Sequence, residues 1–183
     1  MSTWYEQAIF YHMYPLGITG APKINVQTEV TDRFKELDQW IPHIRSLGCN
    51  AIYIGPLFES SSHGYDTRDY KLVDRRLGDN ESFKVFVKQC HDSGIRVVVD
   101  GVFNHTGREF FAFKDILEKG EKSKYLDWYY IDELPLKGEW GEIPNFLCFG
   151  YYGGMPKLNL KNPEVANYIT DVACYWIREC DID

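Results

Sequence analysis

The chain has 183 residues, of which 44% are hydrophobic and 26% charged, so it can form one globular domain with a buried core. Twenty Lys and Arg against 27 Asp and Glu give a net charge of −7, which argues against nucleic acid and anionic membranes as partners. No apolar run approaches the ~20 residues of a membrane span, and no signal-peptide pattern is recognised at the start. The five cysteines are scattered and form no C-x-x-C pair. We therefore expect a cytoplasmic protein with free thiols.

Short apolar segments alternate with helical patterns along the first part of the chain. Residues 8–14, 51–54 and 95–99 are each typical of a buried strand. Apolar residues at steps of three and four predict a helix before residue 48 and another before residue 94, and Pro42 is a point where the first could break. The inward faces of these helices are predicted to hold Val30, Phe34, Leu37, Ile41, Ile44 and Leu47, then Phe83, Phe86, Val87 and Cys90. Strands alternating with helices predict βαβ units and a parallel sheet.

Residues 108–160 lack this rhythm and are rich in aromatic residues and glycine. Because so long a connection is rarely structureless, we interpret it as a small subdomain inserted after the third strand, with aromatics that form mainly its core. These aromatics are Phe110, Phe111, Phe113, Trp128, Tyr129, Tyr130, Trp140, Tyr151 and Tyr152. Asn162 and Pro163 then begin a third helix, and a fourth strand should start near Asp183. The expected divisions are 1–107 for the first βα units, 108–160 for the insert and 161–183 for the third helix.

Two polar clusters follow predicted strands, at residues 63–70 and 100–107. In a parallel α/β architecture ligands bind at the carboxyl ends of the strands, so both clusters are candidate site segments. Asp100 ends an apolar run and must be hydrogen-bonded or face a wet cleft. His105 lies five residues further on and could point into the same cleft. The alternatives are that Asp100 caps a turn and that His105 is structural.

Two further candidates come from the same clusters. Asn104 offers a carbonyl oxygen of the kind that calcium accepts, although it could also be a turn residue. Tyr65 offers a flat apolar ring with a polar tip, suited to stacking on a sugar. In contrast, we interpret Asp74, Arg75 and Arg76 as a solvated run of charges, worth little as ion pairs.

Three of these segments together resemble the α-amylase family of glycoside hydrolases. Asp100-Gly101-Val102-Phe103-Asn104-His105 is similar to the family's motif after the third strand, and residues 64–70 resemble its Gly-Tyr-Asp…Asp-Tyr segment. Met155-Pro156-Lys157-Leu158-Asn159 resembles its Pro-x-Leu-Asn motif, in the form typical of the neopullulanase and cyclomaltodextrinase group. The resemblance runs from about Ile9 to the last residue.

The resemblance implies the N-terminal part of an eight-stranded (β/α) TIM barrel, with about three βα units and a subdomain in the third βα loop. It implies hydrolysis of α-1,4 links, and of α-1,6 links as a further option, in maltodextrins or cyclodextrin-type glucans, with retention. In the family, Tyr65 would be the sugar-stacking ring, His105 would bond a sugar hydroxyl, and Asp100 would position its neighbours. The asparagine that matches Asn104 is a calcium ligand in many amylases, so the resemblance also implies calcium as a possible ligand of Asn104.

The resemblance also places the nucleophile and the acid/base beyond Asp183, because they follow the fourth and fifth strands. This chain alone is therefore expected to hydrolyse nothing. An alternative is a non-catalytic glucan-binding or assembly module that completes its barrel by self-association through its open sheet edge. A further alternative is a truncated piece with no function of its own.

Overall fold

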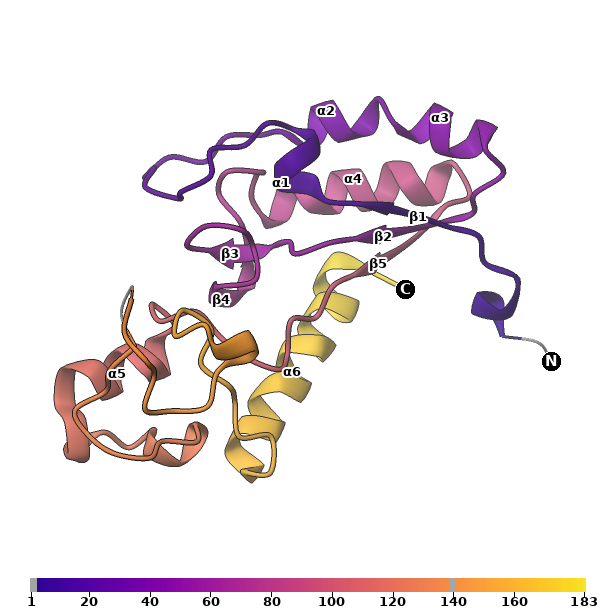
Figure 1. Cartoon of the computed structure of the whole chain (residues 1–183). Helices are drawn as coiled ribbons and strands as arrows, with labels where there is room; N and C mark the ends of the chain where they lie inside the picture. Colours follow the sequence, from indigo (N-terminus) through magenta and orange to yellow (C-terminus); the bar gives the residue numbers. More distant parts are fainter. Residues whose placement is uncertain (1–2, 139–140) are drawn as a thin grey trace. The chain divides into compact units, whose positions relative to one another are not determined.

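The computed structural model describes residues 3–138 and 141–183 (Figure 1). Its strands are β1 (Phe10–Met13), β2 (Ala51–Ile54), β3 (Phe58–Ser60), β4 (Thr67–Val73) and β5 (Arg96–Val99). Its α-helices are α1 (Pro15–Ile18), α2 (Phe34–Asp38), α3 (Ile41–Ser46), α4 (Asn80–Asp92), α5 (Phe111–Lys119) and α6 (Pro163–Cys180). Short 3-10 helices are η1 (Trp4–Gln7), η2 (Gly120–Lys122), η3 (Leu126–Trp128) and η4 (Phe149–Tyr151).

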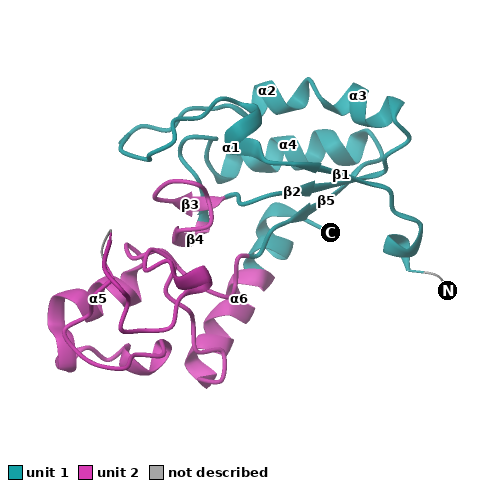
Figure 2. Ribbon diagram, viewed as in Figure 1, with its two compact units in different colours: residues 1–57, 72–101, 175–183 teal, residues 58–71, 102–174 magenta. Residues whose placement is uncertain are grey.

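The chain folds into two compact units, coloured separately in Figure 2. Unit 1 consists of residues 1–57, 72–101 and 175–183, and unit 2 of residues 58–71 and 102–174. The division at residues 107 and 160 expected from the sequence stays a prediction. Each unit is described by itself below.

Unit 1 is built on a parallel sheet in the order β1-β2-β5. Met13 pairs with Ile54, and Ile54 with Val99, so the three strands end in register. Ile52, Ile54 and Val97 are buried, which is why these segments read as apolar runs. The three predicted strands and their parallel arrangement are confirmed. The segments that follow β2 and β5 therefore start from the same edge of the sheet.

The helix predicted before residue 48 is broken into α2 and α3. Trp40 lies between them and Pro42 stands in the first turn of α3, where its missing N–H leaves no hydrogen bond unmade. Phe34 of α2 packs against α4, with ring centroids 5.5 Å from Phe83 and 5.6 Å from Phe86. The predicted inward face is wrong at its two ends, since Val30 and Leu47 are exposed and lie outside both helices.

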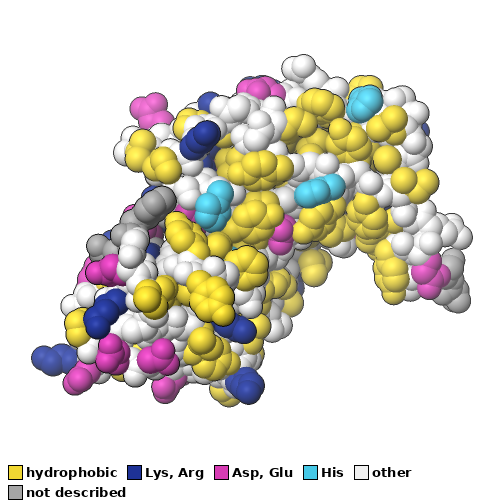
Figure 3. Space-filling model, viewed as in Figure 1, with side chains coloured by type: hydrophobic (Ala, Val, Ile, Leu, Met, Phe, Trp, Pro, Cys, Tyr) yellow, Lys and Arg dark blue, Asp and Glu magenta, His cyan; other side chains and the backbone are white. Residues whose placement is uncertain are grey.

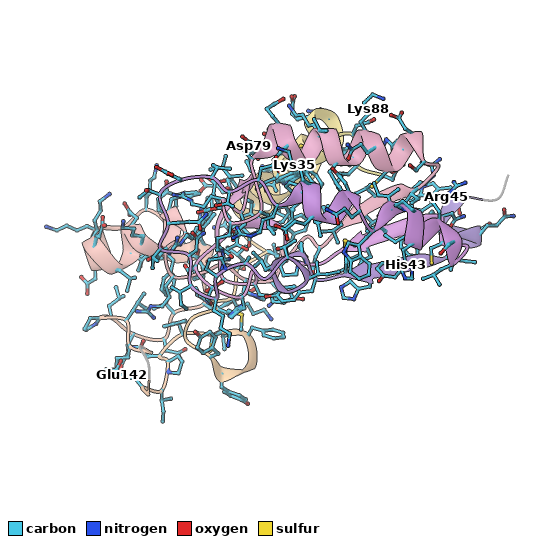
Figure 4. The ribbon with its side chains drawn as sticks, turned by 90° about the horizontal axis from the view of Figure 1, so that it is seen from above. Lys35, His43, Arg45, Asp79, Lys88 and Glu142 are labelled. Carbon is cyan, nitrogen blue, oxygen red and sulfur yellow. The ribbon has the colours of Figure 1, made fainter. Side chains whose placement is uncertain are left out.

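Helix α4 has an N-terminal capping box formed by Asp79 and Ser82. The Asp79 carboxylate accepts from the Ser82 N–H at 2.8 Å, while the Ser82 hydroxyl accepts from the Asp79 N–H at 2.9 Å. Asp79 is labelled at this end of the helix in Figure 4, with Lys88 further along it. This reciprocal capping satisfies donors that every helix start leaves unpaired. Phe83 also lies 5.8 Å from the Trp176 ring, so α4 packs on the last turns of α6 as well.

The interpretation of Asp74, Arg75 and Arg76 as a solvated run is wrong for two of the three. Asp74 and Arg76 are completely buried and form a two-point ion pair, with Arg76 nitrogens 2.8 and 2.7 Å from the Asp74 oxygens. A third guanidinium nitrogen donates to the Pro22 carbonyl at 2.8 Å. Buried charges require such complete pairing, and burial cannot be read from a run of charged letters.

Unit 2 contains elements that the sequence interpretation did not foresee. The segment after β2, for which the sequence indicated only a polar cluster, holds the paired strands β3 and β4. The insert, expected to lack long periodic segments, holds the nine-residue helix α5. The expected third helix is confirmed as α6, where the Asn162 side chain accepts from the Glu164 N–H at 2.9 Å.

Candidate sugar-binding site

The loop between β3 and β4 is tied together by Asp66. Its buried carboxylate accepts from the Ser62 N–H at 3.0 Å and from the Ser62 hydroxyl at 2.6 Å. This closure leaves Tyr65 on the outside of the loop with 40% of its surface exposed. The Tyr65 N–H donates to Nδ1 of His63 at 3.2 Å, and the two ring centroids lie 6.0 Å apart. Tyr65 is therefore an exposed ring on a well-bonded loop.

The segment after β5 is held from within by Tyr70. Val102 adopts a φ of 45°, a conformation that β-branched residues rarely adopt. The Tyr70 hydroxyl lies 3.0 Å from the Val102 carbonyl oxygen and 2.6 Å from that of His105. Burial, with lesser effects of Tyr129 and Tyr168, raises the pKa of Tyr70 well above its usual range. The hydroxyl therefore keeps its proton and fixes the course of this segment.

His105 itself is nearly buried, with 6% of its surface exposed. The Asn104 side-chain nitrogen lies 3.0 Å from its Nδ1. Because an amide nitrogen only donates, Nδ1 accepts and the ring proton sits on Nε2. The imidazole ring also stacks on Phe149, with centroids 5.2 Å apart.

Backbone hydrogen bonds bring the three motif segments together within unit 2. The Gly107 N–H donates to the Thr67 carbonyl at 2.8 Å, which joins the segment after β5 to the start of β4. The Thr106 N–H donates to the Pro156 carbonyl at 3.1 Å, and the Leu158 N–H to the Asn104 carbonyl at 3.0 Å. Segments far apart in the sequence are thus bonded around His105.

The predicted site residues fall into two groups. Tyr65, His105 and Asn104 all belong to unit 2, on segments whose backbones are bonded as described, and Asn104 is exposed. Asp100 belongs to unit 1, where it is half-buried and its N–H donates to the Ile54 carbonyl at 2.9 Å. The structure therefore places the first group on mutually bonded segments of unit 2 and Asp100 at the end of β5, and a common site stays a prediction.

The interpretation from the sequence placed most aromatic residues of the insert in its core, and the structure has both buried and exposed ones. Phe149, Tyr151 and Tyr152 are exposed, whereas the core of unit 2 buries Phe110, Phe113, Trp128 and Tyr129. Trp140 lies outside the described residues. The Tyr152 ring lies 6.4 Å from His63, so both Phe149 and Tyr152 adjoin the histidines of the site. In the sequence, the exposed position of Phe149, Tyr151 and Tyr152 is indicated by no more than the glycines that flank them.

Calcium binding at Asn104 finds no further support. Calcium takes six to eight oxygen ligands, commonly including carboxylates. The described part of the chain holds no group of three or more His, Cys, Asp or Glu side chains that could hold a metal ion. The exposed amide oxygen of Asn104 is a single ligand, and no such carboxylate group among the described residues adds to it.

Comparisons with known proteins show the family to which the chain belongs. The family model described as "Alpha amylase, catalytic domain" matches residues 33–183. The cyclomaltodextrinase of Thermoanaerobacter pseudethanolicus is 48% identical over 98% of this chain and 34% of its own length. That of Geobacillus thermopakistaniensis is 49% identical over 78% of this chain and 24% of its own length.

Solved structures give the same result. The cyclic alpha-maltosyl-(1→6)-maltose hydrolase of Arthrobacter globiformis superposes with a TM-score of 0.85 and 34% identity, over 98% of this chain and 43% of that one. A cyclomaltodextrinase superposes with a TM-score of 0.83 and 38% identity, over 98% of this chain and 33% of that one. The chain thus spans about a third of the length of such relatives, and its open parallel sheet is part of a barrel. With a family model matched over most of its length, the chain belongs to the α-amylase family, in its cyclomaltodextrinase- and neopullulanase-like group.

Proposed function

We propose that this chain forms the sugar-binding part of a retaining glycoside hydrolase. The enzyme would cleave α-1,4 links, with α-1,6 links as a further target, in maltodextrins or cyclodextrin-type glucans. The observation that carries the proposal is the bonding of three motif segments around His105, through Gly107 to Thr67 and through Thr106 to Pro156. Relatives named cyclomaltodextrinase and maltogenic amylase support the substrate class.

The proposed roles follow from the chemistry of each side chain. The exposed ring of Tyr65 stacks on the apolar face of a glucose unit. By the family resemblance, His105 would bond a sugar hydroxyl through Nε2, a nitrogen that is buried in this structure. Asp100 positions its neighbours at the end of β5. None of these residues is proposed to act as nucleophile or acid/base.

Retaining hydrolysis needs two carboxyl groups ~5 Å apart, one as nucleophile and one as acid/base. The family resemblance assigns both to segments beyond Asp183. We therefore propose that the present chain binds glucan but does not cleave it. In the described part no helix is long and apolar enough to cross a membrane. One relative, from Bacillus subtilis, is named an intracellular maltogenic amylase, and we propose a cytoplasmic location here too.

The test is a calorimetric titration of the chain with maltoheptaose. We expect Tyr65→Ala to weaken binding about tenfold, because it removes the stacking ring. Tyr5→Ala is the matched control, since Tyr5 is an exposed tyrosine of unit 1 with 60% of its surface accessible. Failure of the unaltered chain to bind, or equal binding by Tyr65→Ala, would overturn the proposal.

A second function, an assembly module that completes its barrel with another copy, is favoured by the open sheet of unit 1. Its edge strands are β1 and β5, and Ile9, Phe10 and Tyr14 at β1 are exposed. Figure 3 shows hydrophobic side chains gathered on this face of unit 1. Sedimentation equilibrium distinguishes the two functions, because a stable monomer that binds glucan argues against assembly.

A further inference from the structure

His63 closes the tip of the loop between β3 and β4 on which Tyr65 lies. Its Nδ1 accepts from the Tyr65 N–H at 3.2 Å, which ties the side chain to the backbone two residues further on. Gly64 lies between them with a φ of 95°, a conformation that glycine adopts readily. Asparagine side chains make the same bond in an Asx turn, so His63 occupies the place that an asparagine takes in such a turn.

This hydrogen bond requires that Nδ1 carries no proton. A neutral imidazole has one acceptor nitrogen, whereas a protonated imidazole has two donors and no acceptor. Histidine is the side chain whose charge ordinarily changes between pH 5 and pH 8. The His63 side chain has 41% of its surface exposed, so a proton reaches it from solvent. Protonation of His63 would therefore remove the acceptor of the Tyr65 N–H.

The Asp66 carboxylate lies near the same nitrogen of His63. Its Oδ1 is 3.8 Å from Nδ1 and also accepts from the Ser62 N–H at 3.0 Å. A positive charge on His63 would be attracted to this carboxylate, because opposite charges at this distance favour each other. The ring thus has a partner in each charge state, the Tyr65 N–H when neutral and the Asp66 carboxylate when protonated.

The surroundings of His63 contain further rings and charges. The Tyr65 ring centroid lies 6.0 Å from that of His63, and the Tyr152 centroid, from the segment after η4, lies 6.4 Å away. Tyrosine is uncharged throughout the range in which histidine ordinarily titrates, so these rings add no charge. The hollow bordered by Asp66 and Tyr152 is also lined by charged side chains of both signs, Arg108, Glu109 and Lys114.

We propose that His63 is a positioning residue for Tyr65, and that protonation of His63 releases the Tyr65 N–H and weakens glucan binding. Glucan affinity would then fall in mildly acid solution while the acidic side chains around the site stay ionised. This inference rests on the proposed function, in which Tyr65 is the ring that stacks on glucose. The loss of one such hydrogen bond corresponds to about a fivefold change in affinity.

The test is a calorimetric titration of the full chain and of His63→Asn with maltoheptaose, at pH 8 and at pH 5. Asparagine places Oδ1 where histidine has Nδ1, and this amide oxygen remains an acceptor at both pH values. We expect His63→Asn to bind as tightly as the unaltered chain at pH 8 and about fivefold more tightly at pH 5. Because His105 is present in both proteins, the comparison at each pH cancels its own titration.

Two further variants complete the experiment. His63→Leu has no acceptor at this position, so it should bind about fivefold more weakly than the unaltered chain at pH 8. His43→Asn is the matched control, at an exposed position of α3 in unit 1 that is labelled in Figure 4, and should match the unaltered chain at both pH values.

A second measurement follows the hydrogen bond without sugar. In isotope-labelled protein, the amide NMR signal of Tyr65 should move between pH 8 and pH 5 in the unaltered chain and stay in place in His63→Asn. A signal that moves equally in both proteins would overturn the role of His63.

The outcomes separate the two proposals. If the unaltered chain binds no glucan at either pH, the proposed function fails and this inference fails with it. If the chain binds maltoheptaose but His63→Asn has the same affinity as the unaltered chain at pH 5, only the role of His63 is overturned. Weaker binding by His63→Asn at pH 8 also overturns it, because an amide acceptor should replace the neutral ring.

Discussion

Arg76 forms a fully buried ion pair in the interior of unit 1. Its guanidinium is wholly buried, pairs twice with Asp74 and donates to the Pro22 carbonyl. Removing one partner of such a pair leaves an uncompensated buried charge, which costs far more than the pair contributes. The ion pair therefore makes this part of the chain intolerant of single changes.

We expect Arg76→Ala to lower the free energy of unfolding by about 3–5 kcal/mol, measured by urea denaturation. Arg75→Ala, at the half-buried neighbouring position, should cost less than about 1 kcal/mol. The double variant Asp74→Leu/Arg76→Met should recover much of the loss, because it leaves no charge buried. Equal losses for Arg76→Ala and Arg75→Ala would contradict this account.

Gly107 is constrained by the backbone of a neighbouring segment. A Cβ at this position would lie 2.5 Å from the Asp66 carbonyl oxygen and 3.0 Å from that of Thr67. We expect Gly107→Ala to cost about 1–3 kcal/mol of unfolding free energy, because two bonded segments must separate. Gly55→Ala, whose Cβ would meet its nearest atom at 3.4 Å, is the control and should change stability little. An equal loss of unfolding free energy in Gly55→Ala would contradict the steric explanation given for Gly107.

At the scale of elements, the periodicity of apolar residues predicted those strands and helices whose conformation depends on neighbouring residues in the sequence. The strands of unit 1 and helices α4 and α6 follow from apolar spacing and from cap residues such as Asn162. Strand β4 was missed because only Thr67, Tyr70 and Val73 are buried along it, which is not the alternation of a half-buried strand. Its pairing with β3 decides its conformation instead.

Some residues of the candidate site could likewise be predicted from the sequence, and others could not. Tyr65 and His105 could be proposed from sequence because each belongs to a recognisable motif after a strand. Phe149 and Tyr152 could not, because aromatic letters do not say whether a ring faces a core or solvent. Only the folded turn shows that Gly150 and Gly154 permit those rings to lie outside.

Asp183 is hydrogen-bonded to strand β5 of unit 1. Its N–H donates to the Val97 carbonyl at 2.9 Å, and its carboxylate accepts from the Val97 N–H at 2.9 Å and contacts His91 and Arg96. Burial alone would raise the pKa of Asp183, but the Val97 N–H, His91 and Arg96 together hold it below the usual 3.8.

The lowered pKa gives a pH dependence with a definite sign. The unfolded chain binds this proton more readily, so Asp183 stabilises the fold above pH 3.8, and the contribution is lost as pH falls through the lower folded-state pKa. We expect Asp183→Asn to lose less stability than the unaltered chain between pH 5 and pH 2, followed by urea denaturation at each pH. Asp181→Asn, with a 91% exposed side chain, should behave like the unaltered chain.

At the scale of the whole molecule, the question is whether this chain binds a glucan without hydrolysing it. The chain spans about a third of its cyclomaltodextrinase relatives, and the segments bonded around His105 hold its proposed sugar-binding residues. If the nucleophile and the acid/base belong to segments beyond Asp183, as proposed, a glucan bound to this chain has no route to a covalent intermediate. Binding should therefore occur without turnover.

We expect the pure chain to release no reducing ends from maltoheptaose or a cyclodextrin above the buffer rate, in a preparation whose titration shows glucan binding. Any trace of activity must be assigned by comparison with His105→Ala and Tyr65→Ala. Turnover that persists unchanged in both variants belongs to a contaminating enzyme. Turnover that disappears with either of them would show that this chain carries its own catalytic carboxylates, and would contradict the separation of binding from cleavage.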